Sequence, residues 1–457
     1  MSFSLKPARD GGLRCMLLVT ALAALSVGNA AAQPAAKNTT PPAAPAAPSA
    51  TAEAIYRDAK PRLLQIRTLV NTASQKSSTG SGFLISADGL AITNYHVVSQ
   101  HAMEPQTYRM EYVSADGTRG KLKLLSFDVI NDLALVQLDR GGWTYFEFDP
   151  RAVAGSLPRG ERLFSLGNPL DIGFAVMEGN YSGLVERSYS ERIHLSGPMN
   201  PGMSGGPTLT AGSRISGVNV AKAISAEQVS FLVPVKYAAA LLTRPRLPEA
   251  LTGKLTRAEV TRQLVEWQDG LYSALEGKGF KATANGPYQI LESAADWFTC
   301  GAGTNADAKP KPRARWDSSY CSMQNYLFIA GDLHTGNIRL ARAHYTTAEL
   351  NSFQFANFIS QHVSVSSDGS SAKRFTPPSC HEDMFIAGND GAHPRLRVYW
   401  CASAYRDLEG LYNTTLLAVT QDRNNEAAVM TLSLSGVSYA NAMRFAQRLL
   451  AEIKVAP

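Results

Sequence analysis

The sequence lacks the patterns that mark a metal-dependent, nucleic-acid-binding or membrane-spanning protein. Neither H-E-x-x-H nor C-x-x-C occurs in the 457 residues, which argues against a zinc protease and a structural zinc site. Lys and Arg form no dense run, so a nucleic-acid partner is not predicted. The apolar run Cys15–Val27, about 13 residues, is too short to span a bilayer. We therefore predict no metal, no cofactor and no stable membrane span.

That apolar run has the surroundings of a secretory signal peptide. Lys6, Arg9 and Arg14 precede it, and Ala30–Ala32 offers small side chains for cleavage. We predict a signal peptide over residues 1–32 and export across the inner membrane, to the periplasm or the extracellular space. Removing these residues lowers the formal net charge from +6 to +4, which is typical of a solvated, mildly basic surface.

Residues 33–51 are mostly Ala, Pro, Thr and Asn and cannot form a core, so they are predicted to be an extended linker. Residues 52–248 alternate short apolar stretches with turns, which is typical of an all-β sandwich or a pair of barrels. The strands are expected at 63–70, 82–86, 90–94, 112–114, 121–126, 133–138, 163–166, 175–186, 193–196, 215–221 and 229–233, followed by a helix near 234–243.

Residues 249–457 are predicted to form a separate α+β domain. A capping box at Thr256–Glu259 begins a predicted helix. Two units then follow a similar plan, each with two cysteines, a strand pair and a helix, which suggests an internal duplication. The strand pairs are expected at 326–330 with 338–344 and at 414–420 with 427–433, and the helices at 347–361 and 438–453.

The four cysteines that remain after signal cleavage are predicted to form disulfides, because an exported chain matures in an oxidising compartment. The spacing of 21 positions within each successive pair favours local bridges, Cys300 with Cys321 and Cys380 with Cys401.

The stretch Gly197–Pro207 carries the clearest chemical signal. Ser204 lies between Gly202 and Gly205–Gly206, so its hydroxyl is open and backbone N–H groups can converge on one point. A serine nucleophile needs a histidine base and a carboxylate. His96, at the end of a predicted hairpin and held by an apolar strand, is the candidate base. Asp132 directly precedes an apolar strand and is the preferred acid, with Asp128 as the competing choice.

In this order, the motifs resemble those of trypsin-like serine proteases of the HtrA (Deg) type. The matching segments are Gly80–Phe83, Thr93–Val98, Asp128 with Asp132–Leu135, Leu166–Leu170, Asn200–Pro207 and Gly217–Val220. The resemblance covers residues 52–248 and implies two six-stranded β-barrels with the active site between them. It differs from the family in having Met203 before the serine and no recognisable PDZ domain downstream. Residues 249–457 match no family that we can name.

The resemblance implies roles for individual residues. Ser204 would be the nucleophile, His96 the general base and then acid, and Asp132 the group that fixes the histidine tautomer. The backbone N–H groups of Gly202 and Ser204 would form the oxyanion hole. Val218, Asn219, Val220 and Ala221 would line the specificity pocket, which favours small or medium aliphatic side chains, although Lys222 could instead reach an acidic one.

Two functions follow from this reading. The first is a serine endopeptidase of the bacterial cell envelope, acting on proteins or peptides, whose C-terminal domain recruits substrate or regulates access. The alternative is a binding or scaffold protein that keeps the protease fold without turnover. The oligomeric state is left open.

Overall fold

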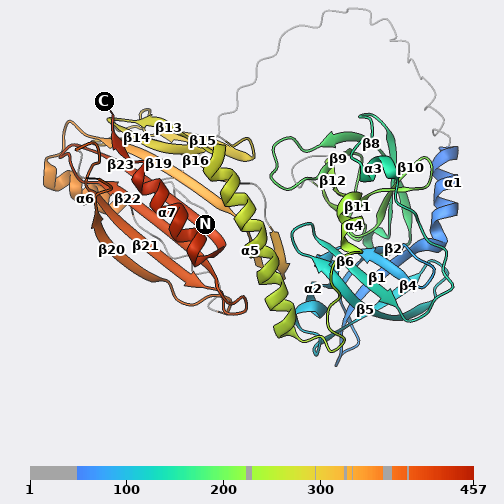
Figure 1. The fold of residues 1–457 in the computed structure, drawn as a ribbon. Coiled ribbons are helices and arrows are strands. Elements are labelled where there is room, and N and C mark those ends of the chain that lie inside the picture. The colour runs from blue at the N-terminus through green and yellow to red at the C-terminus, as the bar shows by residue number, and fades with distance from the viewer. Residues whose placement is uncertain are drawn as a thin grey trace, which may run out of the picture. The chain divides into compact units, whose positions relative to one another are not determined.

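The computed structural model describes residues 49–222, 229–293, 295–323, 327–331, 333–363, 373–388 and 391–456 (Figure 1). The predicted signal peptide and most of the predicted linker lie outside these residues. Helix α1 (Ala50–Ala59) is capped by the Ser49 side chain, so helical structure begins two residues before the expected boundary at 52. In the part of the chain that is described, no helix is long and apolar enough to cross a membrane.

Two closed antiparallel β-barrels form the first region, as predicted. In the first barrel the strands neighbour one another in the order β1-β2-β3-β6-β5-β4, and in the second the order is β10-β11-β12-β9-β8-β7. The first barrel contains β1 (Leu63–Val70), β2 (Lys76–Leu84), β3 (Leu90–Thr93), β4 (Tyr108–Ser114), β5 (Arg119–Asp128) and β6 (Leu133–Leu138). The second contains β7 (Arg162–Gly167), β8 (Ala175–Leu184), β9 (Ile193–Ser196), β10 (Pro207–Thr210), β11 (Ile215–Lys222) and β12 (Val229–Pro234).

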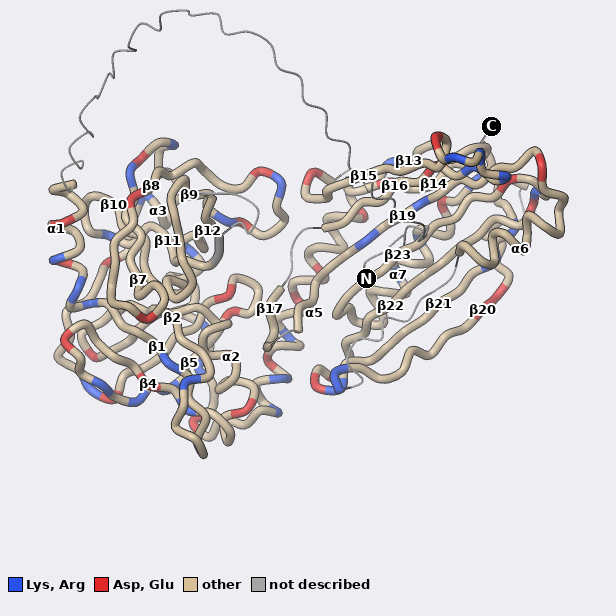
Figure 2. The backbone as a smooth tube through the Cα atoms, turned by 180° about the vertical axis from the view of Figure 1, so that it is seen from behind, with Lys and Arg blue, Asp and Glu red and all other residues tan. Residues whose placement is uncertain are grey.

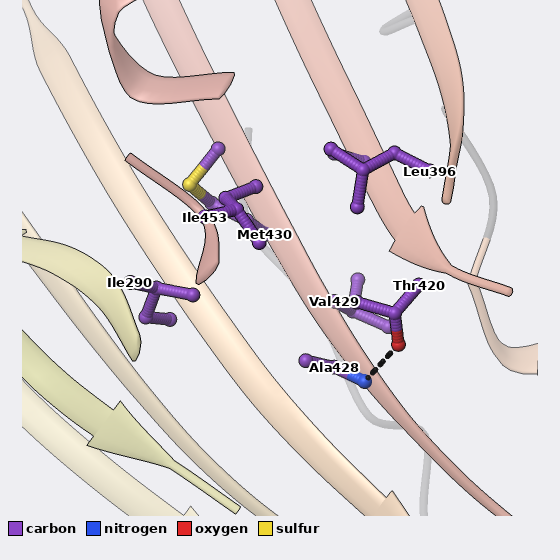
Figure 3. Close-up of a pocket in the computed structure, with 8 residues that line it drawn as sticks. Ile290, Leu396, Thr420, Ala428, Val429, Met430 and Ile453 are labelled. Atoms are coloured by element: carbon purple, nitrogen blue, oxygen red, sulfur yellow. Dashed lines mark hydrogen bonds between the residues drawn. The ribbon is translucent and has the colours of Figure 1, made fainter. Parts of the chain in front are cut away.

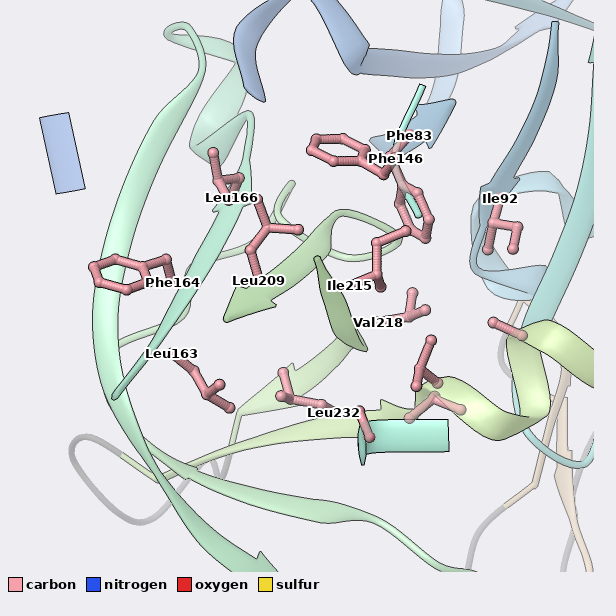
Figure 4. Close-up of a cluster of buried hydrophobic side chains, with 14 of the residues drawn as sticks. Phe83, Ile92, Phe146, Leu163, Phe164, Leu166, Leu209, Ile215, Val218 and Leu232 are labelled. Atoms are coloured by element: carbon pink, nitrogen blue, oxygen red, sulfur yellow. The ribbon is translucent and has the colours of Figure 1, made fainter. Parts of the chain in front are cut away.

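One apolar cluster joins the two barrels. It brings Phe83 and Ile92 of the first barrel together with Phe164, Leu209 and other buried side chains of the second (Figure 4). All four side chains are fully buried, and each such side chain contributes roughly 1.5–3 kcal/mol relative to exposure. The barrels are therefore held as one body, and a site built from both is geometrically fixed.

Besides α1, the barrels are accompanied by the helices α2 (Tyr95–Met103), α3 (Pro150–Val153) and α4 (Val235–Leu241). The prediction of a helix near 234–243 is confirmed. The prediction that a strand holds His96 is wrong, because β3 ends at Thr93 and His96 lies in the first turn of α2. The apolar, β-branched run Val97–Val98 hid this helix, since β-branched residues favour strands when read alone.

The C-terminal region is built on a sheet with strand order β15-β16-β19-β23-β22-β21-β20 (Figure 1). Its strands are β15 (Phe298–Thr304), β16 (Arg315–Met323), β19 (Ile338–Thr346), β20 (Ser379–Phe385), β21 (Leu396–Ala404), β22 (Leu411–Thr420) and β23 (Glu426–Ser438). A small sheet of β13 (Phe280–Asn285), β14 (Tyr288–Ser293) and β24 (Lys454–Val455), and a hairpin of β17 (Leu327–Ala330) and β18 (Leu333–Thr335), accompany it.

Helices cover both faces of the larger sheet. On one face, α5 (Gly253–Lys278) and α7 (Tyr439–Ala451) pack in one cluster with Leu416 and Ala418. On the other, α6 (Ser352–His362) packs with Leu417 and Val419, the alternate residues of the same strand. This layered α+β arrangement agrees with the predicted class.

The core on the α7 side leaves little space. A narrow gap between the sheet, β14 and the end of α7 is lined by Ile290, Met430, Ile453 and five other residues, and it does not admit a water molecule (Figure 3). The C-terminal core is therefore closely packed at this point.

Two local predictions in the C-terminal region are wrong. Thr256 does not cap a helix, because α5 begins earlier, at Gly253, and the Thr252 side chain accepts the Leu255 N–H. Residues 327–330 and 338–344 do not pair, because β17 folds back onto β18, while β19 lies between β16 and β23. Tyr326, the first residue of the predicted strand, lies outside the described residues. Turn-forming residues near 331–337 made both arrangements compatible with the sequence.

The two disulfides are confirmed and lie at opposite edges of the sheet. Cys300 pairs with Cys321, and Cys380 with Cys401. Each bridge joins residues directly opposite each other in an edge hairpin. Edge strands lack a partner on one side, so a cross-link holds the outermost hairpin closed.

Removing one bridge is expected to destabilise the C-terminal region. Replacing both Cys300 and Cys321 with alanine should lower the unfolding free energy of this region by about 3 kcal/mol. This is the stabilisation expected from a disulfide that closes a short loop in the unfolded chain. Denaturant titration of the purified chain, followed by tryptophan fluorescence, measures this. The Cys380/Cys401 double variant is the matched comparison, and an unchanged midpoint in both would contradict a structural role for the bridges.

Charged residues of both signs are interspersed along the chain in the barrels and in the C-terminal region (Figure 2). Among the described residues, neither sign is confined to one segment of the chain.

Candidate active site

His96 is placed by the start of helix α2. The chain leaves β3 at Thr93, and Asn94, the N-cap residue, keeps an extended backbone. His96 therefore lies in the first turn, where helix N–H groups lack intrahelical partners. Its side chain is 28% exposed.

Both carboxylate oxygens of Asp132 interact with His96. Oδ1 accepts the backbone N–H of His96 at 2.8 Å, and Oδ2 lies 2.7 Å from the ring Nδ1. Asp132 has a positive φ of 59°, and its own carbonyl accepts a hydrogen bond from the Asn94 side chain at 2.7 Å. The carboxylate thus caps the helix and fixes the imidazole in one arrangement.

Asp128, the competing acid, faces elsewhere. Its carboxylate accepts the backbone N–H groups of Ile130 and Asn131 and forms an ion pair of 2.9 Å with Arg244. These bonds hold the loop that leads to Asp132. None of them involves the His96 imidazole.

Ser204 lies where the two barrels meet. Its carbonyl accepts the backbone N–H of Ser81 from the first barrel at 2.7 Å, and the next residue, Gly205, donates to Asn219 of the second at 2.9 Å. Its hydroxyl donates to the Val220 carbonyl at 3.3 Å. Gly205 has a φ of +84°, and a Cβ there would overlap the Ser81 carbonyl oxygen, so only glycine fits.

The peptide before Gly202 has a defined orientation. The Pro201 carbonyl accepts the Leu170 N–H at 2.9 Å. In a trans peptide the C=O and N–H point in opposite directions, so the Gly202 N–H points away from Leu170. Gly202 has a φ of +95°, and a Cβ there would overlap the Asn168 carbonyl oxygen. The donor direction at Gly202 therefore depends on glycine and on the loop 168–171.

The electrostatics at His96 favour its charged form. Burial opposes the charge, but Coulombic attraction and the hydrogen bond to Asp132 outweigh it and raise the pKa of His96 above its ordinary 6.5. A histidine with this shift accepts a proton more readily than a free imidazole.

The predicted pocket residues have different surroundings. Val218 is fully buried in the barrel core, and the fully buried Asn219 side chain bonds to Thr208 and to the Leu166 carbonyl. Val220 is half-buried, and the side chains of Ala221 and Lys222 lie outside the described ones. Val218 and Asn219 therefore face the interior of the second barrel, and a pocket role for Val220 and Ala221 stays a prediction.

The described residues hold no group of three His, Cys, Asp or Glu side chains that could bind a metal ion.

Comparison with known proteins agrees with this geometry. The trypsin-like peptidase domain family matches residues 80–218, which contain His96, Asp132 and Ser204. This region is a trypsin-like peptidase domain, and it is similar to the domains of HtrA-type serine proteases. A protein of Synechocystis sp. named as the serine protease HhoB is 32% identical over 177 residues, which cover 37% of this chain and 40% of that protein.

Two further proteins are similar to part of this chain. A protein of Bartonella henselae named as a DegP-like periplasmic serine endoprotease is 33% identical over 147 residues, 31% of this chain and 27% of its own length. The crystal structure of a serine endoprotease from Yersinia pestis has 20% identity and a TM-score of 0.37, covering 42% of this chain and 65% of that one. This chain thus spans well under half the length of the HhoB and DegP-like relatives.

Sequence reasoning missed two supports of the HtrA-type site. The Asn94 side chain holds the Asp132 carbonyl, and the Leu170 N–H holds the Pro201 carbonyl. Both contacts involve a backbone group of the partner, so no residue pattern could have identified them. Asn94 and Leu170 do lie within two of the segments that resemble HtrA-type proteases, Thr93–Val98 and Leu166–Leu170.

Proposed function

We propose that this chain is a serine endopeptidase that hydrolyses peptide bonds through an acyl-enzyme on Ser204. The observation that carries the proposal is the His96–Asp132 pair, with Nδ1 and Oδ2 2.7 Å apart, in a peptidase domain that also presents Ser204 between two glycines. Because this chain covers 40% of the HhoB protein and 27% of the DegP-like protein, the proposed activity of the whole chain rests on this site.

Acylation begins with the Ser204 hydroxyl. It turns from the Val220 carbonyl toward His96 and attacks the substrate carbonyl carbon, while His96 Nε2 takes its proton. Asp132 keeps the Nδ1 proton in place, so Nε2 is the free acceptor. The protonated His96 then gives its proton to the leaving amine, and water repeats the sequence on the acyl-enzyme.

The negative oxygen of the tetrahedral intermediate would be held by the N–H groups of Gly202 and Ser204. The bond from Leu170 to the Pro201 carbonyl supports a Gly202 N–H already turned for this task before substrate binds. Each such donor is worth roughly 10²–10³ in kcat.

Gly202→Ala is expected to lower kcat by about 10²–10³ with a smaller change in KM, because a Cβ at a φ of +95° would overlap Asn168 and turn the donor. Steady-state kinetics on a peptide substrate measure this. Gly160→Ala is the matched control, since Gly160 has a φ of +91° and an added Cβ would meet nothing within 4 Å. Equal losses in both variants would contradict the oxyanion role of Gly202.

The pH dependence follows from the raised pKa of His96. The base works only when neutral, so kcat/KM should rise with pH through an acidic limb whose midpoint lies above 6.5. A profile from about pH 5 to pH 9 measures it. A limb midpoint below 6.5 would contradict the raised pKa.

The cell envelope is the proposed location, because the sequence predicts a signal peptide, the C-terminal region carries disulfides, and relatives are named as periplasmic. We propose the boundaries 52–248 for the protease domain and 249–457 for a C-terminal domain that recruits substrate or regulates access. Protein or peptide substrates fit this arrangement.

The test compares wild type with Ser204→Ala. N-terminal profiling of a cell-envelope extract incubated with each protein should reveal new termini only with wild type. Identical profiles from both proteins would reject the proposal and favour the alternative, a protease fold retained as a binding protein.

A further inference from the structure

The β17–β18 hairpin is where the two halves of the C-terminal sheet differ. In the half that contains Cys380, the strand after β21 is β22, which stays in the sheet. In the half that contains Cys300, β16 pairs directly with β19, and the intervening chain forms a separate two-stranded hairpin. The chain between β16 and β19 therefore leaves the sheet and forms a separate hairpin.

This hairpin packs against the helix that carries His96. Leu327, Ile329 and Leu333 are almost fully buried in one apolar cluster with Tyr95 and Val98 of helix α2. Within this cluster the three aliphatic side chains lose most of their exposure to water, so the hairpin and α2 share one packed core.

The base of the hairpin is anchored to the large sheet. Thr335 is 1% exposed, and its hydroxyl lies 3.3 Å from the Tyr405 hydroxyl. Tyr405 in turn donates to the Asn413 side chain at 2.8 Å. These bonds join the hairpin to β22, so its position on α2 is set by the C-terminal region.

The same region holds the loop that leads to Asp132. Gln263 of α5 accepts the Val129 N–H at 2.8 Å and donates to the Phe127 carbonyl at 3.0 Å. The C-terminal region thus contacts the elements that carry both members of the His96–Asp132 pair.

Phe328 is the residue of the hairpin that contacts the imidazole. Its ring centroid lies 6.0 Å from that of His96 with the planes at 76°, and 6.5 Å from that of Tyr95 at 67°. The Phe328 side chain is half-buried. Edge-to-face contacts of this kind favour one relative orientation of two rings. Asp132 fixes only the Nδ1 edge of the imidazole, and Phe328 adds a second contact from a different domain.

We propose that Phe328 is a positioning residue, through which the C-terminal domain holds the His96 imidazole in its working orientation. The proposal rests on the serine endopeptidase function. It predicts that loss of the ring slows the chemical steps while substrate binding is retained, because the imidazole must stay aligned with Ser204 and the leaving amine.

Phe328→Ala in the full chain is expected to lower kcat about ten-fold or more, with KM within about two-fold of wild type. Phe358→Ala is the matched control, since Phe358 is also half-buried and stacks on a histidine, His362, at 3.9 Å on helix α6. Phe328→Tyr should retain most of the wild-type kcat, because it keeps an aromatic ring next to His96. A kcat loss no larger than that of Phe358→Ala, or a loss confined to KM, would overturn the proposal.

A second readout separates this proposal from the peptidase function itself. Proton NMR of the full chain should show a downfield resonance for the His96 Nδ1 proton shared with Asp132, identified by its absence from Asp132→Asn. The resonance should broaden or disappear in Phe328→Ala and persist in Phe358→Ala. It is read without turnover, so an inactive wild type would reject the endopeptidase proposal alone. A resonance unchanged in Phe328→Ala would reject the positioning role.

Discussion

Replacing Ser204 with alanine is expected to lower kcat by about a million-fold while leaving the fold intact. Without Oγ no acyl-enzyme can form, and the remaining groups act as a unit that depends on the nucleophile. The hydroxyl makes a single long hydrogen bond of 3.3 Å, to the Val220 carbonyl, so its loss should change the unfolding free energy by less than about 1 kcal/mol. Turnover of a quenched peptide and denaturant titration measure the two quantities.

A conservative control accompanies this variant. Ser182→Ala removes a hydroxyl of β8 that bonds to the Ser196 hydroxyl at 2.8 Å and has no part in the proposed mechanism. It should retain wild-type kcat. Peptidase activity that survives in purified Ser204→Ala would contradict the assigned nucleophile.

Replacing Asp132 with asparagine should lower kcat by about 10⁴ because it imposes the wrong histidine tautomer. The backbone N–H of His96 can only donate, so the amide oxygen must take its place at 2.8 Å. The amide NH₂ then faces Nδ1 and forces the ring proton onto Nε2. An Nε2–H group cannot accept the proton of Ser204.

The pH profile distinguishes this explanation from a general loss of structure. Asp132 raises the pKa of His96, so its neutral replacement should move the acidic limb of the residual kcat/KM to lower pH. Asp128→Asn is the matched control, because its carboxylate pairs with Arg244. That variant should lose stability and keep most of its kcat. A larger kcat loss at Asp128 than at Asp132 would contradict the assignment of the acid.

The short strands and the disulfides could be predicted because their signals are local, whereas the choice of two barrels over a sandwich came from the family resemblance. Strand β1 and strand β9 have the bounds expected from alternating apolar residues between turns. The cysteine spacing favoured the two local bridges, and β16 and β21 show why, since each carries its cysteine opposite the neighbouring edge strand. Glycines around Ser204 marked a tight turn that only glycine can make.

The C-terminal contacts could not be predicted, because they depend on residues far apart in the chain. Phe328 and His96 are 232 positions apart, and nothing near either residue indicates the other. Helix α2 was missed because Val97 and Val98 favour a strand when considered alone, whereas the Asp132 carboxylate caps the helix from another loop. At Phe328 and at helix α2, contacts with residues far away in the chain determine the structure, and the local sequence does not.

Labelling with a fluorophosphonate tests the central claim most directly. The reagent phosphonylates a serine only when a base activates the hydroxyl and an oxyanion hole receives the phosphoryl oxygen. Intact-mass and peptide mapping of the full chain should reveal one adduct, on the peptide that holds Ser204, and none in Ser204→Ala. A folded wild-type chain that remains unlabelled, or is labelled on another serine, would contradict this account.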